Sequence, residues 1–294
     1  MELRFFDDPA AFLDVAGETL AAQPVLSTVI AGIAERVRSQ REAGIAWPDG
    51  VPCWFAVALD GDEIAGTVMR TAPFGDHPAY LMPMPEEAVH LLARTLLDRG
   101  EPVLGANGAL PAVRTFCEDM AAATGRQARV AQHTRLFELG DLVEPRPTTG
   151  HLRPATPDEQ PLVTSWYDAF MADADEQAGR EPGESPHESP TDEEMRRRID
   201  SGRIFVWVDD DRPVNVTAAS APAYGVSRIG PVYTPRERRG RGYASAAVYA
   251  VSALLREAGE RPCLFTDQAN PTSNKIYEAI GYRPLVDMAN LRVE

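Results

Sequence analysis

The stretch "RRGRGYASAAV", residues 238–248, lies between a short apolar run and a segment with the periodicity of a helix. It places three arginines and two glycines directly before the small residues that begin the helical pattern. The first backbone N–H groups of a helix have no intrahelical acceptor, and the positive end of the helix dipole lies beside them. The stretch therefore predicts a turn that can bind a phosphate group through its main chain.

The two glycines fit this hypothesis because glycine adopts backbone angles that other residues resist. Gly240 and Gly242 would let an anion approach the main chain, and the small Ala244 would leave that approach clear. The alternative is a tight turn with solvated arginines and no ligand. Other nucleotide motifs fit poorly: Ser245 stands where the third glycine of Gly-x-Gly-x-x-Gly would fall, and no Gly-Lys-Ser/Thr is present.

The second half of the chain predicts a strand, two helices, a hairpin and a strand, followed by helix, strand, helix and strand. Apolar spacing, β-rich runs and glycine stops carry this prediction. The expected elements are a strand from His151, helices within 158–174 and 191–202, a hairpin within 203–222, a strand within 226–234, helices within 244–259 and 271–281, and a strand within 262–267.

The first half repeats this order loosely, so we expect two copies of one fold. Its hairpin falls within 53–70, and "MPMPEEAV" (82–89) stands where the second copy has the glycine turn. Only the second copy can therefore perform the function of that turn. Prolines and glycine interrupt the pattern over 142–156, which places the predicted domains at 1–148 and 149–294.

Length and composition limit the classes of function. The 294 residues suffice for two domains, and the net charge of −15 disfavours binding to a nucleic-acid backbone. No apolar stretch is long enough to span a membrane and no secretory signal is visible, so we expect a cytoplasmic protein without a membrane partner. The widely spaced Cys53, Cys117 and Cys263 predict neither disulfides nor a metal site.

Two motifs resemble the GNAT superfamily of N-acetyltransferases. Arg239 to Ala244 match its Gln/Arg-x-x-Gly-x-Gly/Ala signature, and "DQANPTSNKIYEAIGYRP" (267–284) is similar to its downstream helix and following strand. The resemblance covers 151–294 by motif and the first half by element order, as in tandem GNAT proteins with one degenerate copy. It implies an α/β fold of two GNAT-like domains, each a mixed, largely antiparallel sheet flanked by helices.

The resemblance also implies a cofactor site for acetyl-CoA or another acyl-CoA as co-substrate. The fourth and fifth strands of the C-terminal domain would splay, and the pantetheine arm would lie between them along the backbone of Val232, Tyr233 and Thr234. The pyrophosphate would rest on the turn. Asn270, just after the fifth strand, and Asn274, on the helix expected within 271–281, would complete the site. The implied residues of the turn and helix are Arg239, Gly240, Arg241, Gly242, Tyr243, Ala244, Asn270 and Asn274.

By the same resemblance, Tyr277 would protonate the leaving thiolate of CoA. The alternative is a core aromatic beside Ile276 and Ile280. A general base is harder to name, since 226–234 contains no carboxylate. Asp267 is one candidate; the alternative is that it caps the helix around "NPTSN" or holds the loop. Deprotonation through water is the other route.

The implied function is transfer of an acyl group, most simply acetyl, to a primary amine of a small molecule or to an amino terminus by direct attack. The alternative is a non-enzymatic acyl-CoA-binding or regulatory module. The acidic stretch 173–194 is either a solvated loop or a means of attracting a cationic amine, through Asp173, Asp175 and Glu176. We expect a monomer or a homodimer.

Overall fold

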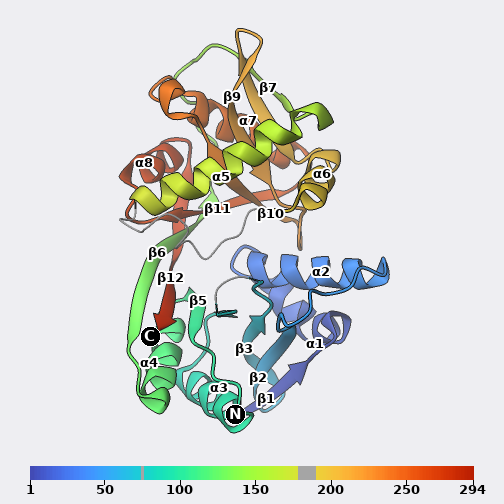
Figure 1. The fold of residues 1–294 in the computed structure, drawn as a ribbon, viewed down its shortest axis with the longest axis vertical. Coiled ribbons are helices and arrows are strands. Elements are labelled where there is room, and N and C mark those ends of the chain that lie inside the picture. Colours follow the sequence, from blue (N-terminus) through green and yellow to red (C-terminus); the bar gives the residue numbers. More distant parts are fainter. Residues whose placement is uncertain (74–75, 178–189) are drawn as a thin grey trace. The chain divides into compact units, whose positions relative to one another are not determined.

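The computed structural model describes residues 1–73, 76–177 and 190–294. The chain forms two compact units, shown with their elements in Figure 1. Unit 1 contains Met1–Arg135 and Val286–Glu294, and unit 2 contains Leu136–Leu285. These bounds differ from the predicted domains, 1–148 and 149–294, in two ways: residues 136–148 belong to unit 2, and the last residues of the chain belong to unit 1.

Unit 1 is a mixed sheet with two pairs of helices. Its strands follow the order β1-β2-β3-β4-β5 and continue to β12; β4 and β5 are parallel, and the other neighbours in this series are antiparallel. The elements are β1 (Glu2–Phe6), α1 (Pro9–Ala22), α2 (Thr28–Glu42), β2 (Trp54–Asp60), β3 (Glu63–Arg70), β4 (Ala79–Leu81), α3 (Glu86–Asp98), β5 (Gly105–Ala109) and α4 (Ala112–Thr124).

Unit 2 has the element order that its sequence predicts. Its strands follow the order β11-β10-β9-β8-β7, with β10 and β11 parallel and the remaining pairs antiparallel. The elements are β7 (His151–Pro154), the 3-10 turn η1 (Pro157–Glu159), α5 (Gln160–Gln177), α6 (Asp192–Asp200), β8 (Ile204–Asp209), β9 (Arg212–Ala219), β10 (Val226–Tyr233), the 3-10 turn η2 (Arg236–Arg238), α7 (Tyr243–Glu257), β11 (Arg261–Asp267) and α8 (Pro271–Ala279).

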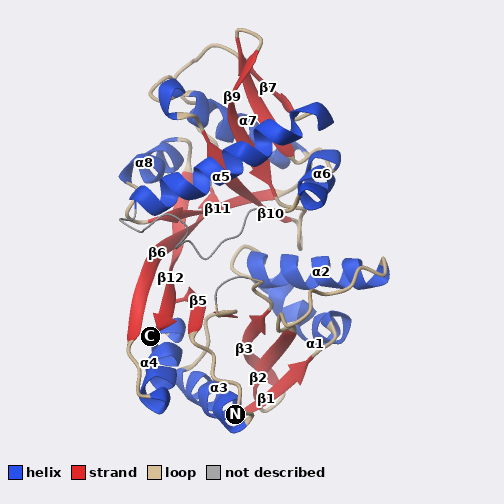
Figure 2. Cartoon of the chain, in the orientation of Figure 1, coloured by secondary structure: helices blue, strands red, loops and turns tan. Residues whose placement is uncertain are grey.

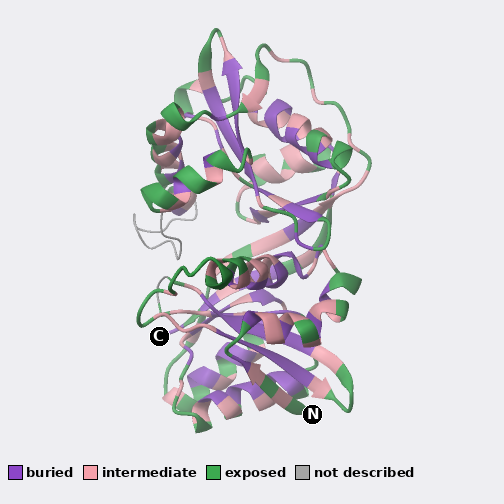
Figure 3. Cartoon of the chain, turned by 90° about the vertical axis from the view of Figure 1, so that its right-hand side faces the viewer, coloured by how far each residue is buried: buried purple, intermediate pink, exposed green. Residues whose placement is uncertain are grey.

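Helices α5 and α7 cover opposite faces of the unit 2 sheet. Side chains of a strand alternate between its two faces. Ile204, Val206 and Val208 of β8 cluster with α5, whereas Phe205 and Trp207 cluster with residues of α7. Both faces are therefore buried, and Figure 3 shows the strands buried and the outer faces of the helices exposed.

Two long strands run through both units. β6 (Ala128–Leu139) crosses the boundary at Arg135, and β12 (Tyr282–Val293) crosses it at Leu285. Met288–Arg292 pair antiparallel with β5, beside which β12 ends in Figure 2. Ala289, Leu291 and Val293 lie in the core of unit 1. The chain's last strand thus completes the sheet of unit 1.

The predicted fold class is confirmed: each unit is a mixed α/β sheet flanked by helices. The turn of the predicted hairpin falls at Asp210 and Asp211, which both adopt positive φ, and Thr191 caps α6 by accepting from the Glu194 N–H at 3.2 Å. In the part of the chain that the structure describes, no helix combines the length and apolar composition needed to cross a membrane.

Candidate functional site

Strands β10 and β11 separate along their length. Their parallel register pairs Val226–Ile229 with Arg261–Leu264 and ends there, although β10 continues to Tyr233 and β11 to Asp267. On its other side β10 remains paired with β9 as far as Tyr233, with a register shift between Ile229 and Val232. The edge of β10 that faces β11 is therefore open from residue 230 onward, as the splayed strand pair requires.

The direction of the peptide groups identifies the residue that faces this opening. The carbonyl oxygen of Tyr233 accepts from Asn215 Nδ2 of β9 at 2.9 Å, so it points toward β9. In an antiparallel strand the N–H and C=O of one residue point to the same side, and those of the next residue point to the opposite side. Val232 consequently directs its N–H and C=O toward β11. The carbonyl of Thr234 accepts instead from Arg239 Nε at 2.9 Å.

Asn215 was not among the predicted site residues. It is completely buried in β9, where it also donates to Thr234 Oγ1 at 3.1 Å and accepts from Thr217 Oγ1 at 2.9 Å. A buried amide needs such partners, and this one fixes the end of β10. The available signal in the sequence was a lone asparagine within the β-rich run "PVNVTAA".

The glycine turn connects η2 to α7 in the conformation that its sequence predicts. Gly240 and Gly242 have φ of 78° and 86°, in the left-handed region that favours glycine. Gly242 is the N-cap of α7, and within the described residues no side chain caps the helix and no acidic residue lies in its first turn. Backbone donors at the start of α7 are thus available to an anion.

Tyr243 and Ala244 begin α7. The side chain of Tyr243 is buried, and its hydroxyl donates to Asp209 Oδ2 at 2.5 Å. This bond and one from Thr149 are the main reasons why the pKa of Asp209 is lowered. The Tyr243 side chain therefore anchors the helix, which leaves its backbone for a ligand. Ala244 is half-buried and presents no bulk at the helix start.

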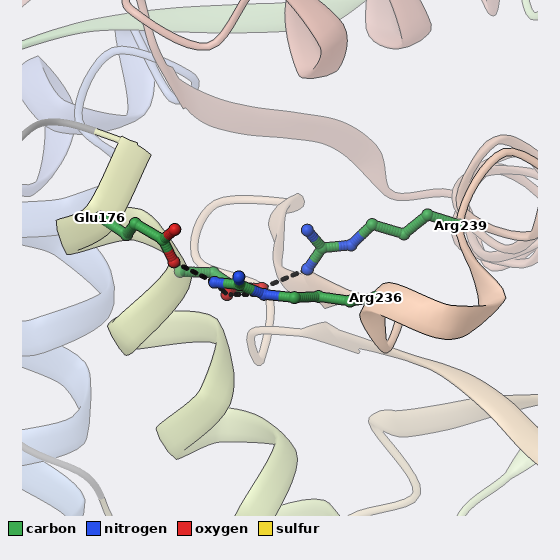
Figure 4. A pocket seen from close by; sticks show the side chains of 4 residues that line it. Glu176, Arg236 and Arg239 are labelled. Carbon is green, nitrogen blue, oxygen red and sulfur yellow. Dashed lines mark hydrogen bonds and ion pairs between the residues drawn. The ribbon is translucent and has the colours of Figure 1, made fainter.

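The arginines before the turn bind helix α5, as Figure 4 shows. Arg236 Nε donates to Asp173 Oδ1 at 2.9 Å, Arg236 also pairs with Glu176, and Arg239 pairs with Asp173. The four side chains line a pocket of about 410 Å³. Burial raises the pKa of the Asp173 carboxyl, but hydrogen bonds from both arginines outweigh it, and the pKa is lowered.

These ion pairs concern two expectations from the sequence: that Arg239 belongs to the cofactor site, and that the acidic stretch attracts a cationic amine. The Arg239 guanidinium contacts Asp173 and the face of Tyr233, 5.7 Å from the ring centroid, in addition to the Thr234 carbonyl. Asp173 and Glu176, which were considered as attractors of a cationic amine, are paired with arginine, and Asp175 is buried. Residues 178–189 of the acidic stretch lie outside the described residues.

The two asparagines near α8 have different surroundings. Asn270 is the N-cap of the helix, and its Oδ1 accepts from the Ser273 N–H at 3.0 Å. Asn274 Nδ2 donates to the Asp267 carbonyl at 3.4 Å, whereas its Oδ1 is buried without a partner among the described residues. An unsatisfied buried acceptor costs ~1–3 kcal/mol. A ligand N–H would satisfy it, so Asn274 fits a cofactor contact.

Tyr277 lies on α8 and packs edge-on against Tyr282, with ring centroids 6.2 Å apart. It is partly exposed at the border of the apolar cluster that contains Leu264 and Ile280. Burial raises the pKa of Tyr277 to about 12. Its hydroxyl therefore keeps its proton at neutral pH. The contacts show the packing that the sequence offered as the alternative, and the proton-donor role stays a prediction.

Asp267, the weak candidate for a base, holds the loop before α8. Its Oδ1 accepts from the Ala269 N–H at 2.8 Å, and its carbonyl accepts from the Asn270 N–H at 3.0 Å. Asp267 thus holds the loop, one of the alternatives considered from the sequence, whereas Asn270 caps the helix. In the residues that the structure covers, no group of three or more histidine, cysteine or acidic side chains is arranged to hold a metal.

Comparison of the chain with known proteins identifies its fold. Residues 212–293 match the family described as FR47-like protein. No curated protein matches the sequence. Among solved structures, an acetyltransferase of the GNAT family from Colwellia psychrerythraea is 10% identical with a TM-score of 0.54, and the alignment covers 100% of this chain and 99% of that one.

Two further structures are similar over nearly their whole length. A tandem GNAT protein from the clavulanic acid biosynthesis pathway is 14% identical, with a TM-score of 0.52 and coverage of 100% of this chain and 98% of that one. A Drosophila protein is 12% identical, with a TM-score of 0.65 and coverage of 99% and 98%. At these identities the likeness establishes the fold. The chain has the GNAT fold, which is the fold that the sequence resemblance implied.

Proposed function

We propose that this chain is an acyl-CoA-dependent N-acyltransferase that uses acetyl-CoA to acetylate a primary amine, with its active site in unit 2. The observation that carries the proposal is the separation of β10 from β11 beside an uncapped glycine turn on a GNAT fold. An open strand edge can bind an extended amide-containing arm as an added strand would bind. The turn offers backbone donors to a pyrophosphate.

The residues present fit the cofactor at three points. Val232 would bond the pantetheine arm through its backbone, and the amides from Arg239 to Ala244 would hold the pyrophosphate. The buried Asn274 Oδ1, which has no donor among the described residues, would accept an amide N–H. When bound, acetyl-CoA supplies a thioester whose carbonyl carbon is the electrophile.

Direct attack by the amine needs no covalent enzyme intermediate. The Val232 N–H, directed toward β11, would stabilise negative charge on the carbonyl oxygen as it develops. Tyr277 would then deliver its hydroxyl proton to the departing sulfur, and its high pKa ensures that the proton is present at neutral pH.

The acceptor amine must lose a proton around the time of attack. β10 carries no carboxylate, and Asp267 is held by the loop before α8, so water is the proposed route for this proton. The acceptor is a small-molecule primary amine or a peptide amino terminus. The ion pairs of Asp173 and Glu176 with arginine give no support to a requirement for a cationic acceptor.

We also propose that unit 1 is a degenerate copy that does not bind the cofactor. At the equivalent place, β4 leads through Pro85 into α3, whose first turn carries Glu86 and Glu87. Carboxylates at a helix N-terminus are stabilised by the dipole and would repel a phosphate. The expected stoichiometry is one acetyl-CoA per chain.

Incubation of the pure protein with acetyl-CoA and a panel of primary amines tests this function. The panel includes monoamines, polyamines and short peptides with free amino termini. Mass spectrometry of the amines is expected to reveal an acetylated product, formed far faster than without protein. Saturable binding of acetyl-CoA without any product would instead support a non-enzymatic acyl-CoA-binding module. Absence of both binding and product would contradict both functions.

A further inference from the structure

The segment immediately before β7 is fixed on strand β8. The Thr149 carbonyl accepts from Trp207 Nε1 at 2.8 Å. Gly150 has a φ of 98°, and a Cβ there would lie 2.3 Å from the Val208 carbonyl oxygen and 2.6 Å from Trp207 Nε1. No other residue fits so close to β8, because such contacts are shorter than van der Waals distances. The backbone of residues 149–150 therefore has a defined position.

From this position Thr148 reaches the glycine turn. Its Oγ1 donates to the Arg241 carbonyl at 2.7 Å, and its Cβ lies 3.6 Å from where a Cβ on Gly242 would stand. Ninety-three residues separate Thr148 from Arg241 in the sequence, so the contact belongs to the tertiary structure. The orientation of this peptide group in the turn thus depends on a residue that lies outside the turn.

The bond from Thr148 determines where the next N–H points. In a planar trans peptide the C=O and the N–H point in opposite directions. With the Arg241 carbonyl held toward Thr148, the Gly242 N–H points away from Thr148 and outward at the N-terminus of α7. Rotation of this peptide would put a carbonyl oxygen in place of the N–H and would repel an anion.

A second bond strengthens the same arrangement. The hydroxyl of Tyr243, the residue after Gly242, donates to Asp209 at the end of β8. The two peptide groups on either side of Gly242 are thus connected to β8, one through Thr148 and one through Tyr243. Gly242 itself, with φ of 86°, has no side chain that could fix its orientation.

We propose that Thr148 is a positioning residue for the cofactor turn: its hydroxyl orients the peptide between Arg241 and Gly242 so that the Gly242 N–H is ready to bind the pyrophosphate. This inference rests on the proposed function. It assigns to the segment that precedes the unit 2 strands a role in cofactor affinity, and it does not involve Thr148 in the chemical step.

The test is a calorimetric titration of acetyl-CoA into the full chain and four variants. Thr148→Val keeps the shape of the side chain and removes the donor, and Thr148→Ala also removes it. Both are expected to bind about ten-fold more weakly, the effect of losing one well-made hydrogen bond. Thr148→Ser keeps the hydroxyl and is expected to bind like the wild type.

Thr95→Val is the matched control, because it removes another threonine hydroxyl that donates to a carbonyl, that of Leu91 at 2.8 Å, in unit 1. It is expected to leave affinity unchanged. With an acetylated amine as readout, Thr148→Val should raise the KM for acetyl-CoA about ten-fold and leave kcat within about two-fold. Thermal unfolding midpoints of the Thr148 variants should remain close to that of the wild type.

Equal affinity of wild type and Thr148→Val, or failure of Thr148→Ser to restore affinity, would overturn the inference and leave the proposed function intact. A fall in kcat at saturating acetyl-CoA together with a lowered unfolding midpoint would overturn it too, because that result indicates general loosening. If the wild type itself does not bind acetyl-CoA, the proposed function fails first.

Discussion

Gly242 matters through its backbone rather than through any side chain. Its φ of 86° lies in a region that costs other residues about 1–2 kcal/mol. Its amide precedes the first turn of α7, where no described side chain competes for the N–H groups. The conformation of this residue could be predicted from the motif, because the preference of glycine for positive φ is a local property of the sequence.

We expect Gly242→Val to weaken acetyl-CoA binding by at least about ten-fold, because strain and a new side chain disturb the turn. Gly259→Val is the control: Gly259 follows the other end of α7, with φ of 78° and no atom within 4 Å of the point that a Cβ would occupy. Both variants should lose about 1–2 kcal/mol of stability. Calorimetry that shows equal affinity in the two variants would contradict the assigned site.

Tyr277→Phe removes the proposed proton donor and preserves the ring that packs against Tyr282. We expect kcat to fall by about 10²–10⁴ with little change in acetyl-CoA affinity. Because burial raises the pKa of Tyr277 to about 12, the ratio of wild-type to variant kcat should stay constant between about pH 7 and 9.

Tyr282→Phe provides the control for that experiment. Tyr282 exchanges a hydrogen bond with Ser252 at 2.8 Å inside the core of unit 2. Loss of this hydrogen bond should lower the free energy of unfolding by about 1 kcal/mol and leave kcat unchanged. Undiminished turnover of Tyr277→Phe at saturating acetyl-CoA would assign Tyr277 to packing alone.

Among the elements of unit 1, helices α3 and α4 are joined by a titratable contact. His90 Nδ1 lies 2.6 Å from Asp119 Oδ2, and Glu86 lies 3.7 Å from the other ring nitrogen. The hydrogen bond with Asp119 is the largest cause of a raised pKa at His90, while nearby Arg94 opposes it. The contact therefore stabilises unit 1 when the imidazole is protonated.

The sign of this effect determines its pH dependence. The folded pKa lies above the unfolded value of about 6.5, so the stabilisation is complete below that value and is lost as pH rises through the folded pKa. In thermal unfolding between about pH 5.5 and 8.5, the wild type should exceed His90→Gln in stability at the acidic end, and the difference should vanish at the basic end. A difference that grows toward high pH would show that the protonated imidazole is not the stabilising form.

Elements were predictable from the sequence where local chemistry defines them. The hairpin of β8 and β9, the Thr191 cap and the two glycines of the turn follow from propensity, capping and backbone freedom. The long-range contacts around the turn could not be predicted in this way. Asp173 and Arg236 are bonded although they lie 63 positions apart in the sequence, and Thr148 and Arg241 lie 93 positions apart. No local sequence pattern indicates such pairs.

The whole molecule differs most from its predicted organisation at the ends of β6 and β12. Composition placed the boundary near the prolines of 142–156, but strand pairing decides which residues share a core. Met288–Arg292 pair with β5, so the end of the chain belongs to unit 1. Pairing of a C-terminal strand with a strand some 180 positions earlier depends on register, which composition does not encode.

Leu291 and Leu285 test this assignment within one strand. Leu291 is 3% exposed in the core of unit 1, whereas Leu285 is 49% exposed. We expect Leu291→Ala to lower the free energy of unfolding by ~2–5 kcal/mol and Leu285→Ala to change it by less than about 0.5 kcal/mol. Urea denaturation monitored through unit 1 measures both, and equal stability of the two variants would place residues 286–294 outside that core.

The proposed function requires that the whole chain bind one acyl-CoA, in the unit that carries the glycine turn. Calorimetric titration of acetyl-CoA into the full chain measures this requirement, because the heat gives both affinity and stoichiometry. We expect a single saturable event with one acetyl-CoA per chain. No binding would contradict the cofactor site, and two equivalents per chain would contradict its restriction to unit 2.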